Sequence, residues 1–218
     1  MKTIIKNHLH YSVENGQRKR FKPWLGDSVS FLYDVIMKHS IFPKKFGADM
    51  DRHFDILNQI LKNVHGKRVL ELATGSGSAV NFLSNDNLYT GTDISPGLLR
   101  KAVKRFDSTG FKNVDFHVTS ADNLPFDDNQ FAVCLCILSL NFFDDINDVF
   151  QEIKRVLVPG AVFICSVPTP ERNRSQCTIR GTLYSEAALE NICRAHGFIF
   201  ESIPFENGAL LYFKAVLA

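Results

Sequence analysis

The residue types best suited to hold a nucleoside follow two neighbouring strand-like runs. Gly75 and Gly77 come directly after the apolar run 69–72, and Asp93 ends the next run, 88–93. Glycines in such a turn let backbone N–H groups approach a ligand closely at a helix N-terminus. A carboxylate after the second strand can accept hydrogen bonds from both ribose hydroxyls, each contributing roughly 1.5–3 kcal/mol. Both features would face one crevice at the carboxyl ends of the strands, so the spacing predicts a nucleotide site.

The glycine turn fits a nucleoside with a cationic group better than it fits a dinucleotide. A dinucleotide fingerprint requires a third glycine, and Val80 stands at that position. Glu71 adds negative charge just before the turn, which opposes the pyrophosphate of a dinucleotide. The same charge favours an ammonium or sulfonium centre, so a nicotinamide dinucleotide is the weaker hypothesis.

Short apolar runs alternate with amphipathic segments from residue 67 onward. Runs this apolar are typical of strands buried on both faces of a parallel sheet, and they cover 68–73, 88–93, 113–119, 131–140 and 161–167. Helices are predicted between or after them at 78–84, 96–106, 144–157 and 185–196. The chain ends in two further strand-like runs around Glu206-Asn207-Gly208, and Asn-Gly favours a hairpin. The pattern predicts a doubly wound α/β fold whose mostly parallel sheet ends in an antiparallel strand.

The first 66 residues are predicted to be a helical extension of the same domain, and residues 67–218 its α/β part. Asp27 or Ser28 is expected to cap a helix whose apolar face carries Phe31, Leu32, Val35 and Ile36. A second helix is expected from Ala48 to Val64, ended by Gly66.

Residues 1–26 are polar and basic, with Arg18, Lys19, Arg20 and Lys22 close together. Such a segment is interpreted as a solvated, mobile arm. The alternative is an ordered lid whose Trp24 or Tyr11 covers a ligand.

Composition and charge exclude several classes of protein. The 218 residues are 45% hydrophobic and 22% charged, which excludes collagen-like and disordered chains. The formal charge of +2 gives a polyanion-binding role no support. Five cysteines without a CxxC pair predict neither a zinc site nor a disulfide framework. No signal sequence and no membrane span are predicted, so a cytoplasmic location is expected.

Five segments resemble, in order, the motifs of the class I S-adenosylmethionine-dependent methyltransferases: VLELATGSG, TGTDIS, SADNLPFDDNQFAVCLC, EIKRVLVPGAVFI and SEAALENICRAHGF. The resemblance covers about residues 67–218 and is strongest to the type 11 proteins and the ubiquinone/menaquinone C-methyltransferases. It implies a Rossmann-like fold with a seven-stranded sheet, S-adenosylmethionine as methyl donor and S-adenosylhomocysteine as product. It also implies that residues 1–66 shape the substrate pocket as a lid.

The resemblance assigns a set of residues to the cofactor. Glu71, Ala73, Gly75, Ser76 and Gly77 are placed at its methionine end, Asp93 at the ribose, Ile94, Ser120, Ala121 and Asp122 at the adenine, and Ile137 nearby. Ala73 replaces a family glycine, which is tolerable if its φ stays negative. Ser120 stands where the family often has Asp or Asn, and a hydroxyl accepts a hydrogen bond more weakly. Asp122 is the alternative partner for the adenine amino group.

The acceptor side of the site is less specified. Phe142 and Phe143 are expected to line the pocket, and Tyr33 and His39 to border it. The loop arginines Arg172, Arg174 and Arg180 either clamp an anionic substrate or lie solvated. Nineteen phenylalanines favour an apolar or aromatic acceptor.

The leading hypothesis is methyl transfer to an oxygen, nitrogen or carbon atom of a small molecule, with no general base assigned. An RNA or protein methyltransferase on the same fold is the first alternative, disfavoured by the near-neutral charge but kept open by the basic arm. A non-catalytic S-adenosylmethionine-binding module is the second. Neither the methylated atom nor the oligomeric state is assigned.

Overall fold

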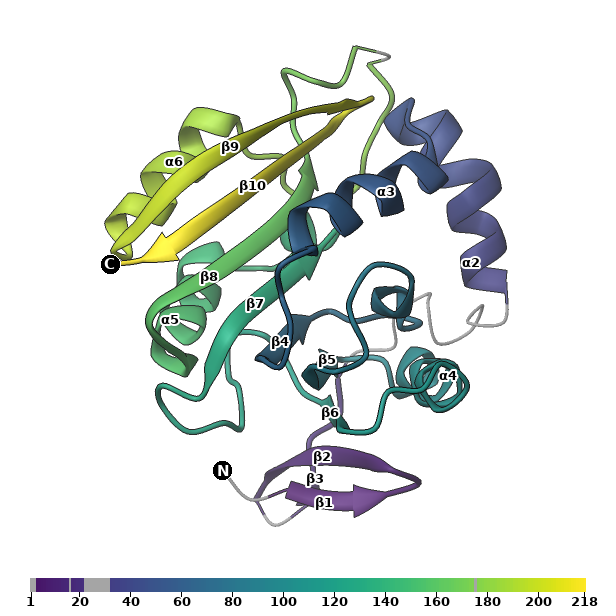
Figure 1. Ribbon diagram of the computed structural model, residues 1–218, viewed down its shortest axis with the longest axis vertical. Helices are drawn as coiled ribbons and strands as arrows, with labels where there is room; N and C mark the ends of the chain where they lie inside the picture. Colours follow the sequence, from purple (N-terminus) through teal and green to yellow (C-terminus); the bar gives the residue numbers. More distant parts are fainter. Residues whose placement is uncertain (1–2, 16, 22–31, 175) are drawn as a thin grey trace.

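The computed structural model describes residues 3–15, 17–21, 32–174 and 176–218. One continuous sheet crosses the molecule, with helices packed on both of its faces (Figure 1). Its strand order is β1-β2-β6-β5-β4-β7-β8-β10-β9, and β3 pairs with β2. The segment from β6 to β9 is the predicted seven-stranded sheet, in which only β10 runs antiparallel to the other strands.

The strands are β1 (Thr3–Lys6), β2 (Leu9–Glu14), β3 (Gln17–Arg18), β4 (Arg68–Leu72), β5 (Leu88–Asp93), β6 (Val114–Val118), β7 (Phe131–Ile137), β8 (Leu157–Pro168), β9 (Phe198–Asn207) and β10 (Leu210–Leu217). The helices are α2 (Tyr33–Ile36), α3 (Met50–Leu61), α4 (Pro96–Asp107), α5 (Ile146–Val156) and α6 (Glu186–Ala195). A wider π-helical segment, η2 (Met37–Phe46), continues α2, and η3 (Ser78–Asn81) and η4 (Leu140–Phe142) are single 3₁₀ turns.

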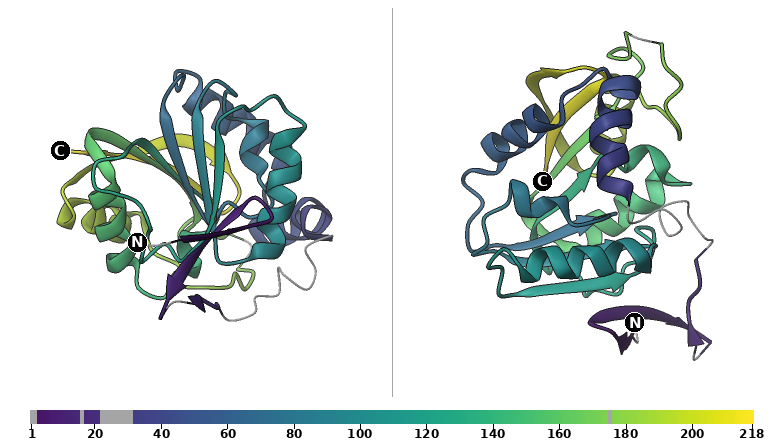
Figure 2. Two further views of the ribbon diagram at one scale, coloured as in Figure 1. Left: turned by 90° about the horizontal axis from the view of Figure 1, so that it is seen from below. Right: turned by 90° about the vertical axis from the view of Figure 1, so that its right-hand side faces the viewer.

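The central strands are buried on both faces, as their apolar runs predict. On β7, Cys134 and Cys136 point into one core, while Val133, Leu135 and Ile137 point into the other. Helices α3 and α4 cover the second of these cores, and α5 and α6 cover the first (Figures 1 and 2). The two-sided burial explains why the strand shows no alternation of polar and apolar residues.

The helices that flank the site begin at side chains that cap them. Ser95 accepts a hydrogen bond from the Leu98 amide at the start of α4, and Pro96 occupies the first helical position. Asp145 plays the same part at α5 by accepting from the Asn147 amide. These caps fix where each helix leaves the loop that follows a strand.

The predicted Asn-Gly hairpin connects β9 and β10 and also anchors the N-terminal helices. The Asn207 side chain accepts a hydrogen bond from the Asp49 amide (2.8 Å) and donates one to the Asp49 carbonyl (2.9 Å). A Cβ atom on Gly208 would lie 2.1 Å from the Phe46 carbonyl oxygen. Only glycine therefore lets the hairpin tip meet the end of η2.

Two predictions about local structure are wrong. Residues 1–26 are not a solvated arm throughout, because β1, β2 and β3 extend the sheet beyond β6 at the end remote from β9 (Figure 2). Tyr11 pairs with Val118 inside this extension and covers no cavity. The helix predicted at 78–84 is only the turn η3, since Val80 and the asparagines around it have low helix propensity.

Several predicted features lie outside the described residues: the caps Asp27 and Ser28, Phe31 and Trp24. In the described part of the chain, every helix is too short or too polar to cross a bilayer.

Candidate functional site

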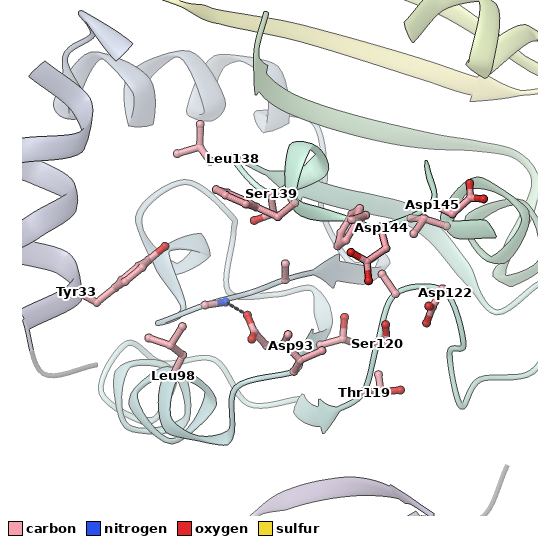
Figure 3. Close-up of a pocket in the computed structure, with 18 residues that line it drawn as sticks. Tyr33, Asp93, Leu98, Thr119, Ser120, Asp122, Leu138, Ser139, Asp144 and Asp145 are labelled. Carbon is pink, nitrogen blue, oxygen red and sulfur yellow. Dashed lines mark hydrogen bonds between the residues drawn. The ribbon is translucent and has the colours of Figure 1, made fainter. Parts of the chain in front are cut away.

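A cavity of about 210 Å³ opens where β4, β5, β6 and β7 end (Figure 3). Most of the residues that line it lie at or directly after the carboxyl ends of these strands, as expected for a ligand site in an open α/β sheet. The cavity is lined by Tyr33, Ala73, Gly75, Thr92, Asp93, Ile94, Leu98, Thr119, Ser120, Ala121, Asp122, Leu138, Ser139, Phe142, Phe143, Asp144, Asp145 and Val149.

Asp93 is held in one orientation at the cavity wall. One carboxylate oxygen accepts a hydrogen bond from the Gly75 amide (2.9 Å), and the other accepts from the Ser95 amide (2.8 Å). Only 9% of the residue surface is exposed. An ionised carboxylate has about four acceptor positions, and the Gly75 and Ser95 amides each occupy one of them.

The glycine loop packs tightly against α4. A Cβ atom on Gly77 would lie 2.9 Å from Ala102, and Gly77 has a φ of 82°. Gly77 therefore packs the loop against the helix, and neither Gly77 nor Ser76 lines the cavity. The expected long helix after this loop is absent, so the loop gains little from a helix dipole.

The N-terminal strands support the loop that carries Ser120, Ala121 and Asp122. The Ser12 hydroxyl on β2 donates a hydrogen bond to the Thr119 hydroxyl (2.9 Å), which donates to the Asn123 carbonyl (3.1 Å). The three residues between Thr119 and Asn123 line the cavity. Sequence reasoning missed the support from Ser12 because it treated residues 1–26 as an arm.

Glu71 does not line the cavity, contrary to its predicted place at the cationic end of the ligand. It is 2% exposed and accepts a short hydrogen bond from the Tyr89 hydroxyl. Burial raises the pKa of Glu71 to about 7, although hydrogen bonds from Tyr89 and Thr74 act in the opposite direction. The carboxyl group is therefore part of the core beneath the site.

Two residues at the cavity have left-handed backbones although neither is glycine. Ala73 has a φ of 51°, so the condition under which alanine would be tolerated without strain is not met. Leu138 has a φ of 61° and turns the chain into the cavity directly after β7. This turn puts Leu138 at the wall in place of Ile137, whose side chain packs in the core. Such backbones cluster at binding and catalytic sites.

The aromatic wall is where the sequence predicts it. Phe142 and Phe143 line the cavity, and Tyr33 reaches it from α2 (Figure 3). Burial, followed by the charges of Asp93 and Asp34, raises the pKa of Tyr33 to about 12, so the hydroxyl stays protonated. His39 is exposed and does not reach the cavity.

The loop arginines do not form a clamp at the cavity. Arg172 donates to the Phe205 carbonyl (3.3 Å) and pairs with Glu186 (3.4 Å). Arg174 and Arg180 are exposed. The solvated-loop interpretation therefore holds for Arg174 and Arg180, and Arg172 ties the loop to the hairpin.

Some lining residues were missed by sequence reasoning, and some left a usable signal. Asp144 and Asp145 precede α5 in the loop that follows a predicted strand, so the topology alone places them at the crevice. Leu98 and Val149 belong to α4 and α5, helices that the sequence predicts without giving either residue a place at the site. Within the described residues, no three His, Cys, Asp or Glu side chains are grouped closely enough to hold a metal ion.

A comparison with protein families finds a match for the region that forms the cavity. Residues 70–165 match the family model Methyltransf_11, described as a methyltransferase domain. The matched segment contains the glycine loop, Asp93 and the loop with Ser120, and it includes every lining residue of the cavity except Tyr33.

Curated relatives are similar over part of the chain. The ubiquinone/menaquinone biosynthesis C-methyltransferase UbiE of Desulfotalea psychrophila is 37% identical over 155 residues, 62% of this chain and 61% of that protein. The phthiotriol/phenolphthiotriol dimycocerosates methyltransferase of Mycobacterium leprae is 33% identical over 101 residues, 45% of this chain and 36% of that protein. The chain thus spans less than two thirds of these relatives.

A solved structure of similar fold is that of an S-adenosylmethionine-dependent methyltransferase from Aquifex aeolicus. The TM-score is 0.66 at 16% sequence identity, over 87% of this chain and 98% of the other. At 16% sequence identity, the similarity of the two structures is evidence for the fold alone.

Proposed function

We propose that the chain is an S-adenosylmethionine-dependent methyltransferase of the type 11 family and that it transfers a methyl group to a small apolar or aromatic molecule. The observation that carries the proposal is the fixed Asp93 carboxylate, which lines a cavity beside Gly75 at the carboxyl ends of parallel strands. This arrangement suits a ribose diol joined to an amino-acid tail.

The described residues fit such a nucleoside. Asp93 offers acceptors for the ribose hydroxyls, and Ile94 offers an apolar, 37% exposed surface for the adenine. Ser120, Ala121 and Asp122 line the adenine side of the cavity, where a hydroxyl, a backbone amide and a carboxylate are available. At the other end Gly75 leaves room for the methionine part beside Tyr33.

Bound S-adenosylmethionine supplies a sulfonium methyl group that is already activated for attack by a nucleophile. The chain has to hold donor and acceptor in line and exclude water, which accounts for a large part of the rate enhancement in such transfers. Tyr33, Phe142 and Phe143 provide apolar surface for this purpose. No side chain is assigned as a general base.

The chemistry of the wall and the names of the relatives support the acceptor class. Phe142 is 48% exposed beside the cavity, and a partly exposed aromatic side chain there favours an apolar or aromatic acceptor over a charged one. One relative is named for carbon methylation in ubiquinone and menaquinone biosynthesis, and the other for methylation of phthiotriol dimycocerosates. We therefore propose a lipophilic small molecule, with carbon as the favoured methylated atom.

The proposal is tested by donor binding and label transfer. Calorimetry should show binding of S-adenosylmethionine and S-adenosylhomocysteine and none of NAD. Incubation of the protein and methyl-tritiated donor with a cell extract should then place the label in the organic-soluble fraction.

Two results would overturn this proposal. Preference for NAD would remove the donor assignment. Label recovered in RNA or protein, or donor binding without any transfer, would replace the acceptor class with one of the alternatives.

A further inference from the structure

One carboxylate joins three elements around the methionine end of the cavity. Asp34, in the first turn of α2, accepts a hydrogen bond from the Ser76 hydroxyl in the glycine loop (2.6 Å). Its second oxygen accepts from Arg105 (2.7 Å) and pairs with Lys101 (3.3 Å), both on α4. The loop, α2 and α4 are thus bridged by a single side chain.

These contacts are strong for a half-buried group. Burial by itself would raise the pKa of Asp34, but the hydrogen bond from Ser76 and the charges of Arg105 and Lys101 leave it below its usual value. Asp34 is therefore ionised at neutral pH, and its hydrogen bonds are charge-assisted, which makes them roughly twice as strong as neutral ones.

The residue next to Asp34 forms part of the cavity wall. The Tyr33 hydroxyl lies 3.9 Å from the position that a Cβ atom on Gly75 would occupy. Figure 3 places Tyr33 at the end of the cavity opposite Asp122 and Asp145. Displacement of the first turn of α2 would therefore open the cavity at this end.

The apolar side chains of this turn bury little surface. No residue of α2 is fully buried, and Val35 and Ile36 are 54% and 38% exposed. Apolar packing begins farther along, where Phe42 and Phe46 of η2 enter the core. The hydrogen bonds and ion pairs of Asp34 thus fix the segment that carries Tyr33, while η2 holds independently.

We propose that Asp34 is a positioning residue for donor binding: it fixes Tyr33 over Gly75 and holds the glycine loop against α4. This inference rests on the proposed function, because the ligand is the donor assigned there. It also gives Ser76 a different role from the predicted one, since Ser76 faces Asp34 and does not line the cavity.

The test measures S-adenosylhomocysteine affinity by calorimetry in wild type, Asp34→Ala, Ser76→Ala and the double variant. We expect Asp34→Ala to weaken binding about 10-fold, the loss expected for a charge-assisted contact that orders a binding wall. Ser76→Ala should weaken binding in the wild-type background and have no further effect in the Asp34→Ala background. Asp34→Asn, which keeps an acceptor for Ser76, should recover part of the loss.

A matched control separates positioning from general loosening of the helices. Asp51→Ala removes the exposed Lys38–Asp51 ion pair (3.1 Å) between η2 and α3, away from the cavity. It should bind S-adenosylhomocysteine like the wild type. Wild-type affinity should also fall from low to high salt, and that dependence should be smaller in Asp34→Asn, because half-exposed ion pairs are screened.

The inference is overturned if Asp34→Ala binds within about twofold of wild type, if the Ser76→Ala effect is undiminished in the Asp34→Ala background, or if Asp51→Ala loses as much affinity. Failure of the wild type itself to bind S-adenosylhomocysteine would overturn the proposed function instead.

Discussion

At the scale of single residues, Glu71 and Asp93 show how two carboxylates on neighbouring strands acquire different surroundings. Glu71 pairs with Gly91 in the parallel ladder, and Tyr89 and Asp93 lie two residues to either side of Gly91. Tyr89 reaches Glu71 with its hydroxyl, whereas Asp93 is the last residue of β5 and lines the cavity. The sequence reveals the strand ends, but it does not reveal which side chain fills the space next to a given carboxylate.

Burial of Glu71 predicts a specific dependence of stability on pH. The folded pKa of about 7 lies above the ordinary value of 4.5, so the folded state retains a proton that the unfolded state loses. The stabilisation is present below pH 4.5 and is lost as the pH rises to about 7. At about 1.4 kcal/mol per pKa unit, the loss is roughly 3 kcal/mol.

Urea unfolding of wild type and Glu71→Gln from acidic to mildly alkaline pH isolates this effect. The variant cannot ionise but keeps an acceptor for Tyr89, and the neutral buried histidines are common to both proteins. The free energy of unfolding of wild type relative to Glu71→Gln should fall steadily between pH 4.5 and about 7 and then level off. A constant difference would show that Glu71 is not buried as a protonated acid.

At the scale of elements, the turn after β4 is constrained at both ends. The Thr74 amide donates to the Thr92 carbonyl (2.8 Å), and the Gly75 amide donates to Asp93. The chain leaves the strand through Ala73 with a φ of 51°, which is unfavourable for any residue with a Cβ atom. The constraint comes from β5, which is why the sequence around Ala73 does not show it.

Ala73→Gly is therefore expected to raise the free energy of unfolding, by about 1 kcal/mol. The control is Ala187→Gly at an exposed position in α6, which should lower it by roughly 0.5–1 kcal/mol. Urea unfolding of both variants without ligand measures the two effects. If Ala73→Gly is destabilising like its control, the left-handed backbone at Ala73 is wrong.

The elements that the sequence predicts well are those with a local cause. Pro96 and Ser95 define the start of α4, and the run 88–93 matches β5 at both ends. The elements predicted poorly depend on distant partners. β2 forms because it pairs with β6, more than a hundred residues away, and the basic residues beside it conceal its alternating pattern of Leu9, Tyr11 and Val13.

At the scale of the whole molecule, the N-terminal part of the chain supports the cavity from two sides. Ser12 of β2 contacts Thr119 beside Ser120, and Asp34 of α2 contacts Ser76 in the glycine loop. The prediction that residues 1–66 form a substrate lid remains a prediction. The strands β1, β2 and β3 in this part of the chain were not predicted. Only the assembled sheet shows that β6 has an edge with which another strand can pair.

The candidate site was predictable where it depends on topology. Asp93, Gly75 and Ser120 follow three different strands, and a parallel sheet necessarily brings their ends together. The side chains of Ile137 and Glu71 lie in the core, and the sequence does not show this because a single residue of shift along a strand reverses the direction of the side chain.

The most direct test of the central claim is a crystal structure of the protein with S-adenosylhomocysteine. Both ribose hydroxyls should lie within about 3 Å of the Asp93 carboxylate, with the adenine beside Ile94 and Ala121. A nucleoside bound elsewhere, or an Asp93 carboxylate turned away from the sugar, would contradict the account.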